Sequence, residues 1–181
     1  MELYFVTSNE NKLKEARQIL GIKIKQLRLD IKEIQSMNVS EVIENKAIKA
    51  YESVQKPVIV EDTGLYIKAL NGFPGALIKW VLATVGNKGI CHMVNGKNRE
   101  AYAETAVCLF NGQKAILFTG RINGTITSTP IGKTGFGWDQ VFRPKGHSLT
   151  FAQMGPEEKN KVSMRMIALK KLERYLATHQ S

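Results

Sequence analysis

The sequence predicts an α/β protein that forms one domain over residues 1–181. A chain of this length can bury one sizeable core. Two observations indicate the fold class. Residues 58–60 are continuously apolar, as in a strand that is covered on both faces, and Pro57 before them suits a strand start. The carboxylates of Glu61 and Asp62 follow directly, at the end of the strand where ligands collect in open α/β sheets.

The other elements follow from local patterns along the chain. Apolar spacing predicts a helix over residues 11–20 and another that begins near Ser40, a good N-cap, and ends at residue 54. The pairs Asn111-Gly112 and Asn123-Gly124 predict two hairpin turns. The expected strands are 3–7, 24–29, 58–60, 101–110, 113–121 and 125–129, and the remaining expected helices are 76–85, 88–94 and one after residue 163. Residues 30–37 are expected to be irregular, residues 65–70 begin a further element, and residues 71–75 form a turn.

A break is predicted between two helical segments near the C-terminus. Lys159 and Arg165 are six residues apart, so on one continuous helix they would point about 120° away from each other. They can face one ligand only if the chain breaks near Ser163, which is a plausible N-cap. In the middle of the chain, Trp80 is most simply explained as a core or subunit contact.

Composition narrows the function without deciding it. The formal net charge of +10 favours polyanionic partners, either nucleotides or nucleic acid. No zinc-finger pattern, RNA-binding aromatic signature or basic heptad is present, so we expect no specific nucleic-acid partner. Cys91 and Cys108 do not suggest a disulfide scaffold, and the three histidines are too scattered for a zinc site. No apolar run approaches the roughly 18 residues that span a bilayer, and we expect a cytoplasmic protein with no membrane partner.

Two stretches are candidates for binding a metal ion and phosphates. Paired carboxylates at Glu61 and Asp62 repel each other unless a cation or proton lies between them, and Mg²⁺ suits such oxygen ligands. Ser8 or Asn9 can cap the helix that follows, where free backbone N–H groups and Lys12 would favour a phosphate. The alternatives are a solvated turn after the strand, and an ordinary capped helix with a surface lysine.

A glycine-rich loop over residues 132–142 is a third candidate. It brings Phe136, Trp138 and Asp139 close together, and the aromatic rings could stack on a base, a contact typically worth about 1–3 kcal/mol. The alternative is a tight turn with core aromatics. Glu33, in the irregular segment, looks like a surface acid when it is considered alone.

Four stretches follow one another along the chain. They are Thr7-Ser8-Asn9 with Lys12; residues 60–65 with Gly72-Phe73-Pro74-Gly75; residues 135–139; and Glu157-Glu158-Lys159-Asn160 with Ser163 and Arg165. Taken together and in this order, they resemble the inosine/xanthosine triphosphate pyrophosphatase family over nearly the whole chain. The resemblance implies an α/β fold with a long curved mixed sheet, flanked by helices in two lobes around a central nucleotide cleft, usually as a homodimer.

The resemblance also implies a reaction and its residues. Mg²⁺-dependent hydrolysis would convert ITP, dITP or XTP to the monophosphate and pyrophosphate. Asp62 would activate water and bind metal together with Glu33, while Glu61 is the alternative metal ligand and the alternative base. The implied substrate-binding residues are Thr7, Ser8, Asn9, Glu10, Asn11, Lys12, Thr63, Phe136, Gly137, Trp138, Asp139, Lys159, Met164 and Arg165.

One position departs from the family pattern. Met164-Arg165 stands where the family usually has His-Arg. Arg165 can still donate to the 6-oxo group of a base, but a methionine cannot hydrogen-bond as histidine does. We therefore hypothesise weaker base preference or affinity than in typical members.

Two alternative functions remain open. One is a pyrophosphatase for a different modified nucleotide, which a substrate panel would distinguish. The other is a non-catalytic basic protein that binds nucleic acid, which predicts salt-sensitive binding to DNA or RNA and no release of pyrophosphate.

Overall fold

One mixed sheet organises the protein. The computed structural model describes residues 3–21 and 23–179. Within these residues, seven strands form the sheet in the order β2-β1-β3-β5-β6-β7, and β4 pairs with β3 outside this path. Strand β1 pairs in parallel with β2 and β3, whereas every other pair is antiparallel. The strands are β1 Tyr4–Val6, β2 Lys25–Leu27, β3 Val58–Ile67, β4 Pro74–Gly75, β5 Glu100–Phe110, β6 Ala115–Ile126 and β7 Phe142–Pro144.

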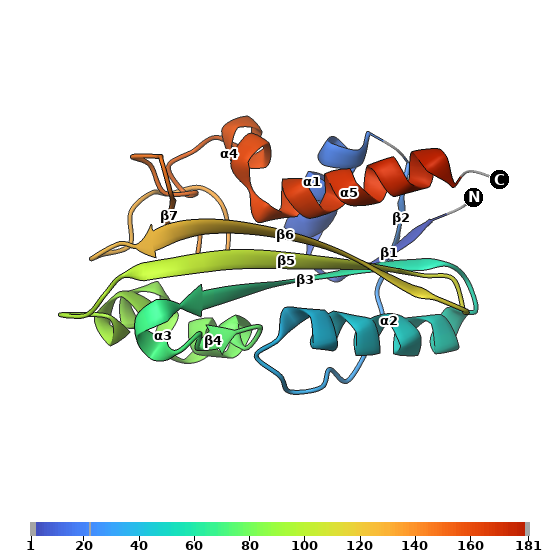
Figure 1. Cartoon of the computed structure of the whole chain (residues 1–181), viewed down its shortest axis with the longest axis horizontal. Helices are drawn as coiled ribbons and strands as arrows, with labels where there is room; N and C mark the ends of the chain where they lie inside the picture. Colours follow the sequence, from blue (N-terminus) through green and yellow to red (C-terminus); the bar gives the residue numbers. More distant parts are fainter. Residues whose placement is uncertain (1–2, 22, 180–181) are drawn as a thin grey trace.

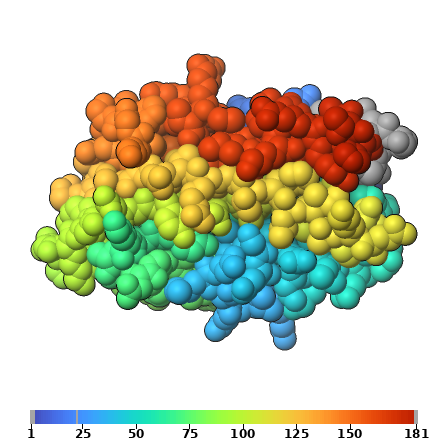
Figure 2. Space-filling view, viewed as in Figure 1, coloured from blue at the N-terminus to red at the C-terminus, as the bar shows by residue number. Residues whose placement is uncertain are grey.

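Helices cover both faces of this sheet. Helices α1, α4 and α5 lie on one face, and α2 and α3 lie on the other (Figure 1). The space-filling view shows β6 in yellow between the red C-terminal helix and the blue and cyan residues of α2 (Figure 2). The helices are α1 Glu10–Leu20, α2 Val39–Val54, α3 Ile78–Met93, α4 Pro156–Val162 and α5 Met164–Thr178, and a short 3₁₀ helix covers Lys68–Leu70.

The core explains why residues 58–60 are continuously apolar. Ile59 packs into the cluster that α1 and α5 form, whereas Val58 and Val60 pack into the cluster that α2 forms on the other face. A third cluster lies toward the other end of the sheet, around α3, β7 and the glycine-rich loop. The predicted α/β class, with a long mixed sheet flanked by helices, is therefore confirmed.

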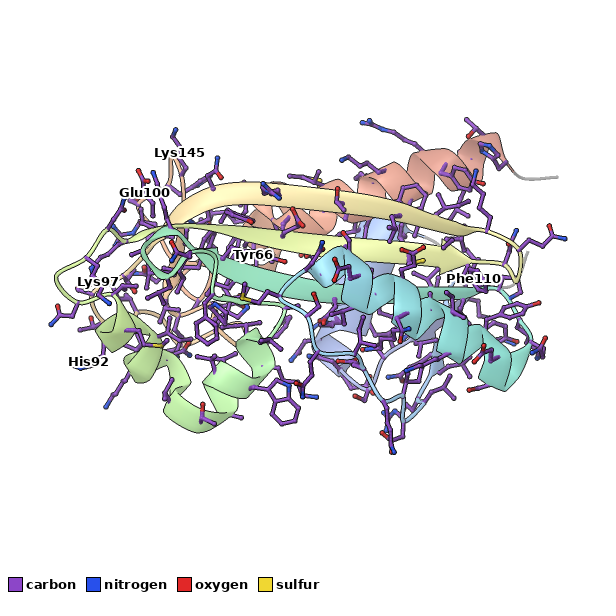
Figure 3. The ribbon with its side chains drawn as sticks, turned by 60° about the horizontal axis from the view of Figure 1, so that its bottom comes forward. Tyr66, His92, Lys97, Glu100, Phe110 and Lys145 are labelled. Carbon is purple, nitrogen blue, oxygen red and sulfur yellow. The ribbon has the colours of Figure 1, made fainter. Side chains whose placement is uncertain are left out.

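Helix α2 runs along the sheet between two aromatic contacts. The hydroxyl of Tyr66 accepts a hydrogen bond from the N–H of Val39 at 3.1 Å, at the start of the helix. Near its end, the ring of Tyr51 meets Phe110 edge to face, with centroids 5.4 Å apart. Figure 3 shows Tyr66 and Phe110 far apart along the sheet.

The predicted end of the central strand was wrong. Strand β3 continues to Ile67, so Glu61 and Asp62 lie inside a strand. The strand continues because β5 pairs with it throughout, including Glu61 with Val107. The parallel pairing with β1, however, stops at Val60. The two acids therefore lie just beyond the point where the parallel part of the sheet ends.

The second predicted hairpin turn was also wrong. Asn123 and Gly124 lie within the continuous strand β6, because β5 pairs along one side of it and β7 along the other. A β-carbon at Gly124 would lie 2.4 Å from the carbonyl oxygen of Arg143, so glycine is needed there for close strand packing. The first turn, at Asn111-Gly112, is confirmed as the connection between β5 and β6.

Helix boundaries match the predictions with small differences. Asn38 caps α2 in place of Ser40, because its side-chain oxygen accepts the N–H of Ser40 at 2.9 Å. Helix α3 is kinked at Gly86, between the two helices that were predicted there. Trp80 is 63% exposed, so it is not a core residue. No helix within the described residues is long and apolar enough to cross a membrane.

The predicted break at Ser163 is confirmed. Helix α4 ends at Val162 and α5 begins at Met164, with extended backbone at Ser163 between them. The hydroxyl of Ser163 accepts a hydrogen bond from the N–H of Met166 at 3.2 Å, as an N-cap does. The break lets Lys159 and Arg165 face the same region.

Candidate active site

Most of the predicted site residues line one cleft. The cleft has a volume of about 730 Å³, within the range of small-molecule sites. Its walls come from α1, β3, the irregular segment before α2, the start of α3, the glycine-rich loop, α4 and α5. Glu10 and Asn11 do not line it. The predicted residues that do are Thr7, Ser8, Asn9, Lys12, Glu33, Glu61, Asp62, Thr63, Phe136, Gly137, Trp138, Asp139, Lys159, Met164 and Arg165.

The N-terminus of α1 is capped by Asn9. Its side-chain oxygen accepts hydrogen bonds from the N–H groups of Asn11 at 3.0 Å and Lys12 at 3.3 Å. Two of the backbone donors that the sequence offered to a phosphate are therefore already satisfied. Glu10, outside the cleft, pairs with Arg28 and accepts a hydrogen bond from Gln26.

Glu61 is buried beneath the cleft and fully paired. Its carboxylate accepts hydrogen bonds from Arg165 Nε at 2.7 Å and Nη2 at 3.1 Å, and Lys12 Nζ lies 3.4 Å from Oε1. Burial disfavours the charged carboxylate, but Arg165 and Lys12 outweigh this and lower the pKa of Glu61 to about 2. Its side chain is 0% exposed, so Glu61 fits the alternative roles of base or metal ligand poorly.

Asp62 is the more accessible acid of the pair. Its side chain is 22% exposed, and Oδ1 accepts hydrogen bonds from Lys12 Nζ at 3.1 Å and from the N–H of Thr63 at 2.9 Å. No described residue donates a hydrogen bond to Oδ2. One oxygen of Asp62 is therefore available to water or to a metal ion.

A second cluster of charged side chains joins α1, α4, α5 and the glycine-rich loop. Lys159 Nζ lies 2.7 Å from Asp139 Oδ2 and 3.0 Å from Glu15 Oε1. Glu15 also pairs with Arg165. Asp139 further accepts a hydrogen bond from the N–H of Phe136 at 2.8 Å. Burial raises the pKa of Asp139, although Lys159 opposes this effect.

The two aromatic residues of the loop have different environments. Trp138 is buried and meets Phe142 edge to face, with ring centroids 5.5 Å apart. Phe136 is half-buried, and its ring lies 4.4 Å from Lys159 Nζ and 5.6 Å from the guanidinium carbon of Arg165. The interpretation as core aromatics thus describes Trp138, whereas Phe136 packs against the charged groups of the cleft.

Met164 is buried between the cleft and the core. It is only 2% exposed and belongs to the apolar cluster that contains Trp138. Its backbone lies close to β6, where a β-carbon at Gly120 would be 2.0 Å from the Met164 carbonyl oxygen. The first turn of α5 is therefore held tightly against the sheet.

Comparison with known proteins supports a family assignment. The model of the Ham1 family matches residues 3–175 of the chain. The chain belongs to the Ham1 family. A dITP/XTP pyrophosphatase of Thermococcus kodakarensis is 41% identical over 180 residues, which cover 97% of each chain. An inosine triphosphate pyrophosphatase of Yarrowia lipolytica is 42% identical over 183 residues, which cover 98% of this chain and 96% of the other.

Solved structures share the fold. A HAM1 protein from Coxiella burnetii superposes with a TM-score of 0.87 at 27% sequence identity. The match covers 98% of this chain and 100% of that one. The Ham1 fold therefore extends over the whole described structure.

Sequence reasoning missed several charged residues of this Ham1 site. Lys32, Lys46 and Lys79 line the cleft, and Glu15 pairs with two of its cations. Lys46 pairs with Glu33, whereas neither Lys32 nor Lys79 forms an ion pair with any described residue. Net charge was the available signal, but it does not say which lysines gather at one place.

The cleft of this Ham1 protein offers few metal ligands. Among the described residues, no three His, Cys, Asp or Glu side chains are grouped as a metal site. Mg²⁺ commonly uses one or two carboxylates together with substrate phosphates and water. Asp62 and Glu33 are the candidates for this role, because both line the cleft and their side chains are 22% and 37% exposed.

Proposed function

We propose that the protein hydrolyses non-canonical purine nucleoside triphosphates, such as ITP, dITP and XTP, to the monophosphate and pyrophosphate. The observation that carries the proposal is one cleft that gathers Asp62 with cationic groups from both ends of the chain, including Lys12 and Lys159. The names of the relatives support the same substrate class.

Asp62 would take the proton of the attacking water. Its Oδ2 oxygen is free of hydrogen bonds from described residues, while Lys12 and the N–H of Thr63 fix its other oxygen. The activated water would attack the α-phosphorus. The bond between the α-phosphorus and the oxygen that bridges it to the β-phosphorus would break, and pyrophosphate would leave with that oxygen. This assignment uses general base catalysis, which typically contributes 10² to 10⁴-fold.

The lysines of the cleft would bind the phosphates. Lys32 and Lys79 are the first candidates, because they have no carboxylate partner among the described residues. Lys46 and Lys159 are paired with acids and would exchange those partners for phosphate oxygens, whereas Lys12 would keep Asp62 as its partner. Mg²⁺, held by Asp62 and Glu33, would offset further phosphate charge when it is bound.

The base would lie toward the glycine-rich loop and α5. Phe136 supplies a half-buried ring there, and Asp139 and Arg165 supply polar groups. Arg165 already donates to Glu61 and Glu15, so any contact with a 6-oxo group would use its remaining N–H capacity. The expected preference for bases with a 6-oxo group over adenine stays a prediction.

The test is release of pyrophosphate from ITP, dITP, XTP, GTP and ATP, each measured with Mg²⁺ and with EDTA. We expect rapid release from ITP and XTP, slow release from ATP, and loss of activity in EDTA. Salt-sensitive binding to DNA or RNA without any release of pyrophosphate would contradict the proposal. Light scattering on the same sample tests the proposed homodimer, for which exposed Trp80 is a candidate contact.

A further inference from the structure

Glu61 lies at the floor of the cleft, where it links α1 to α5, but its carboxylate is covered. Its carboxylate contacts Arg165 of α5 through two hydrogen bonds, Lys12 of α1 at 3.4 Å, and the hydroxyl of Thr63 at 3.2 Å. The side chain has no exposed surface. Because its oxygens are occupied and covered, its contribution to a reaction in the cleft must pass through its partners.

Lys12 is the partner that touches the proposed base. Its ammonium group has three N–H donors, and three acceptors surround it. Asp62 Oδ1 lies at 3.1 Å, Glu61 Oε1 at 3.4 Å, and the carbonyl oxygen of Glu61 at 3.5 Å. Glu61 thus supplies two of the three acceptors, and it holds Lys12 to one side of Asp62.

We infer that Glu61 is a positioning residue for hydrolysis. Glu61 and Asp62 both pair with Lys12, so the ammonium group of this lysine does not pair with Asp62 alone. The two-point contact with Arg165 in turn holds the carboxylate of Glu61 in place, so that Lys12 meets a fixed group. The inference rests on the proposed function, because pyrophosphate release is its readout.

The first test is the Glu61→Gln variant. Without the carboxylate charge, Lys12 should pair more closely with Asp62, so kcat for ITP should fall by about 10 to 100-fold, as expected for a misplaced catalytic group. KM should change much less. The Mg²⁺ concentration for half-maximal activity should stay the same, whereas a raised Mg²⁺ requirement would identify Glu61 as a metal ligand and overturn the inference.

A control variant tests whether removal of a carboxylate from another strand would lower kcat in the same way. Glu104 on the neighbouring strand β5 pairs with Arg121 at 2.7 Å, and neither residue lines the cleft. Glu104→Gln also removes an arginine–carboxylate pair from a strand, but one in which the arginine is 55% exposed. We expect wild-type kcat and KM from this variant, and an equal loss of kcat in both variants would overturn the inference.

The deciding test is a double-mutant cycle with Lys12→Met. If Glu61 acts through Lys12, kcat of the double variant should be no lower than that of Lys12→Met alone. Effects that multiply independently would overturn the inference. A residue that only stabilises the fold would lower the melting temperature without this coupling in kcat.

A second substitution covers the case in which Glu61→Gln does not fold. Glu61→Asp keeps the charge but withdraws the carboxylate by one methylene group, and the same cycle with Lys12→Met applies to it. Independent effects would again overturn the inference. Failure of the wild-type protein to release pyrophosphate from ITP would instead contradict the proposed function.

Discussion

Asp62 combines an anchored oxygen with a free one. Lys12 and the N–H of Thr63 hold Oδ1, while Oδ2 has no hydrogen bond from a described residue. Asp62→Asn keeps the shape but removes the base, so kcat for ITP should fall by about a hundredfold or more. Steady-state release of pyrophosphate measures this. If the variant kept the wild-type kcat, Asp62 could not be the base, and another group would have to be.

Met164 offers a test of base selectivity at the residue scale. It is buried beside the cleft in an apolar cluster, where an imidazole could donate a hydrogen bond to a base oxygen. Met164→His should raise kcat/KM for ITP and XTP relative to ATP and lower the melting temperature. Met164→Leu is the matched control, because it keeps the apolar volume. No gain in kcat/KM from histidine would contradict the hypothesis.

The contact between β6 and α5 determines where Arg165 lies. A β-carbon at Gly120 would be 2.0 Å from the Met164 carbonyl oxygen and 2.8 Å from the Ala168 nitrogen. Gly120→Ala should therefore displace the start of α5, lower kcat/KM for ITP by tenfold or more, and destabilise the protein by about 1–3 kcal/mol. Urea unfolding and pyrophosphate release measure the two effects.

Gly155 provides the control for this substitution. It precedes α4, and a β-carbon there would meet no atom within 4 Å. Gly155→Ala should cost less than about 1 kcal/mol, because Gly155 has φ −68°, which alanine also adopts, and only its suitability as an N-cap changes. Equal destabilisation by the two substitutions would show that the close contact of Gly120 with α5 is not the cause of the destabilisation.

At the level of elements, the sequence predicted the features that depend only on neighbouring residues, such as helix caps. The caps at Asn9 and Ser163 were found because a side-chain oxygen needs only neighbouring N–H groups to act. Asn123-Gly124 misled because tertiary pairing with β5 and β7 overrides a turn preference. Glu15 gave no signal, because its importance depends on α1 lying beside α5.

The candidate site was predicted more completely than its internal pairing. Each of the four stretches contributes residues to one cleft, although Gly72-Phe73-Pro74-Gly75 does not line it. Which cation meets which acid could not be read from spacing, since Arg165 reaches Glu61 across 104 positions of sequence. Trp138 was expected at a base, but Phe142 and the surrounding cluster enclose it.

At the level of the whole molecule, the ion pairs that link α1, β3 and α5 make stability depend on pH. Arg165 and Lys12 lower the pKa of Glu61 from 4.5 to about 2 in the folded protein. A lowered carboxylate pKa contributes stability above the unfolded value, and this contribution is lost as the pH falls from about 4.5 toward 2. The contribution at neutral pH is on the order of 3 kcal/mol.

Urea unfolding in EDTA measures this contribution. The difference in unfolding free energy between wild type and Glu61→Gln should be largest at pH 6 and should shrink steadily between pH values of about 4.5 and 2. A difference that does not change over this range would contradict the assignment of Glu61 as the titrating group.

The partners of Glu61 come from distant parts of the polypeptide, and this has a consequence for synthesis. Helix α5 is made after α1 and β3, yet it provides Arg165, and α4 just before it provides Lys159. A nascent chain that still has these helices inside the ribosome leaves Glu61 without Arg165 and one wall of the cleft open. Newly made protein should therefore acquire its proposed nucleotide site only after α5 has left the ribosome, and removal of α4 and α5 should abolish the site rather than trim it.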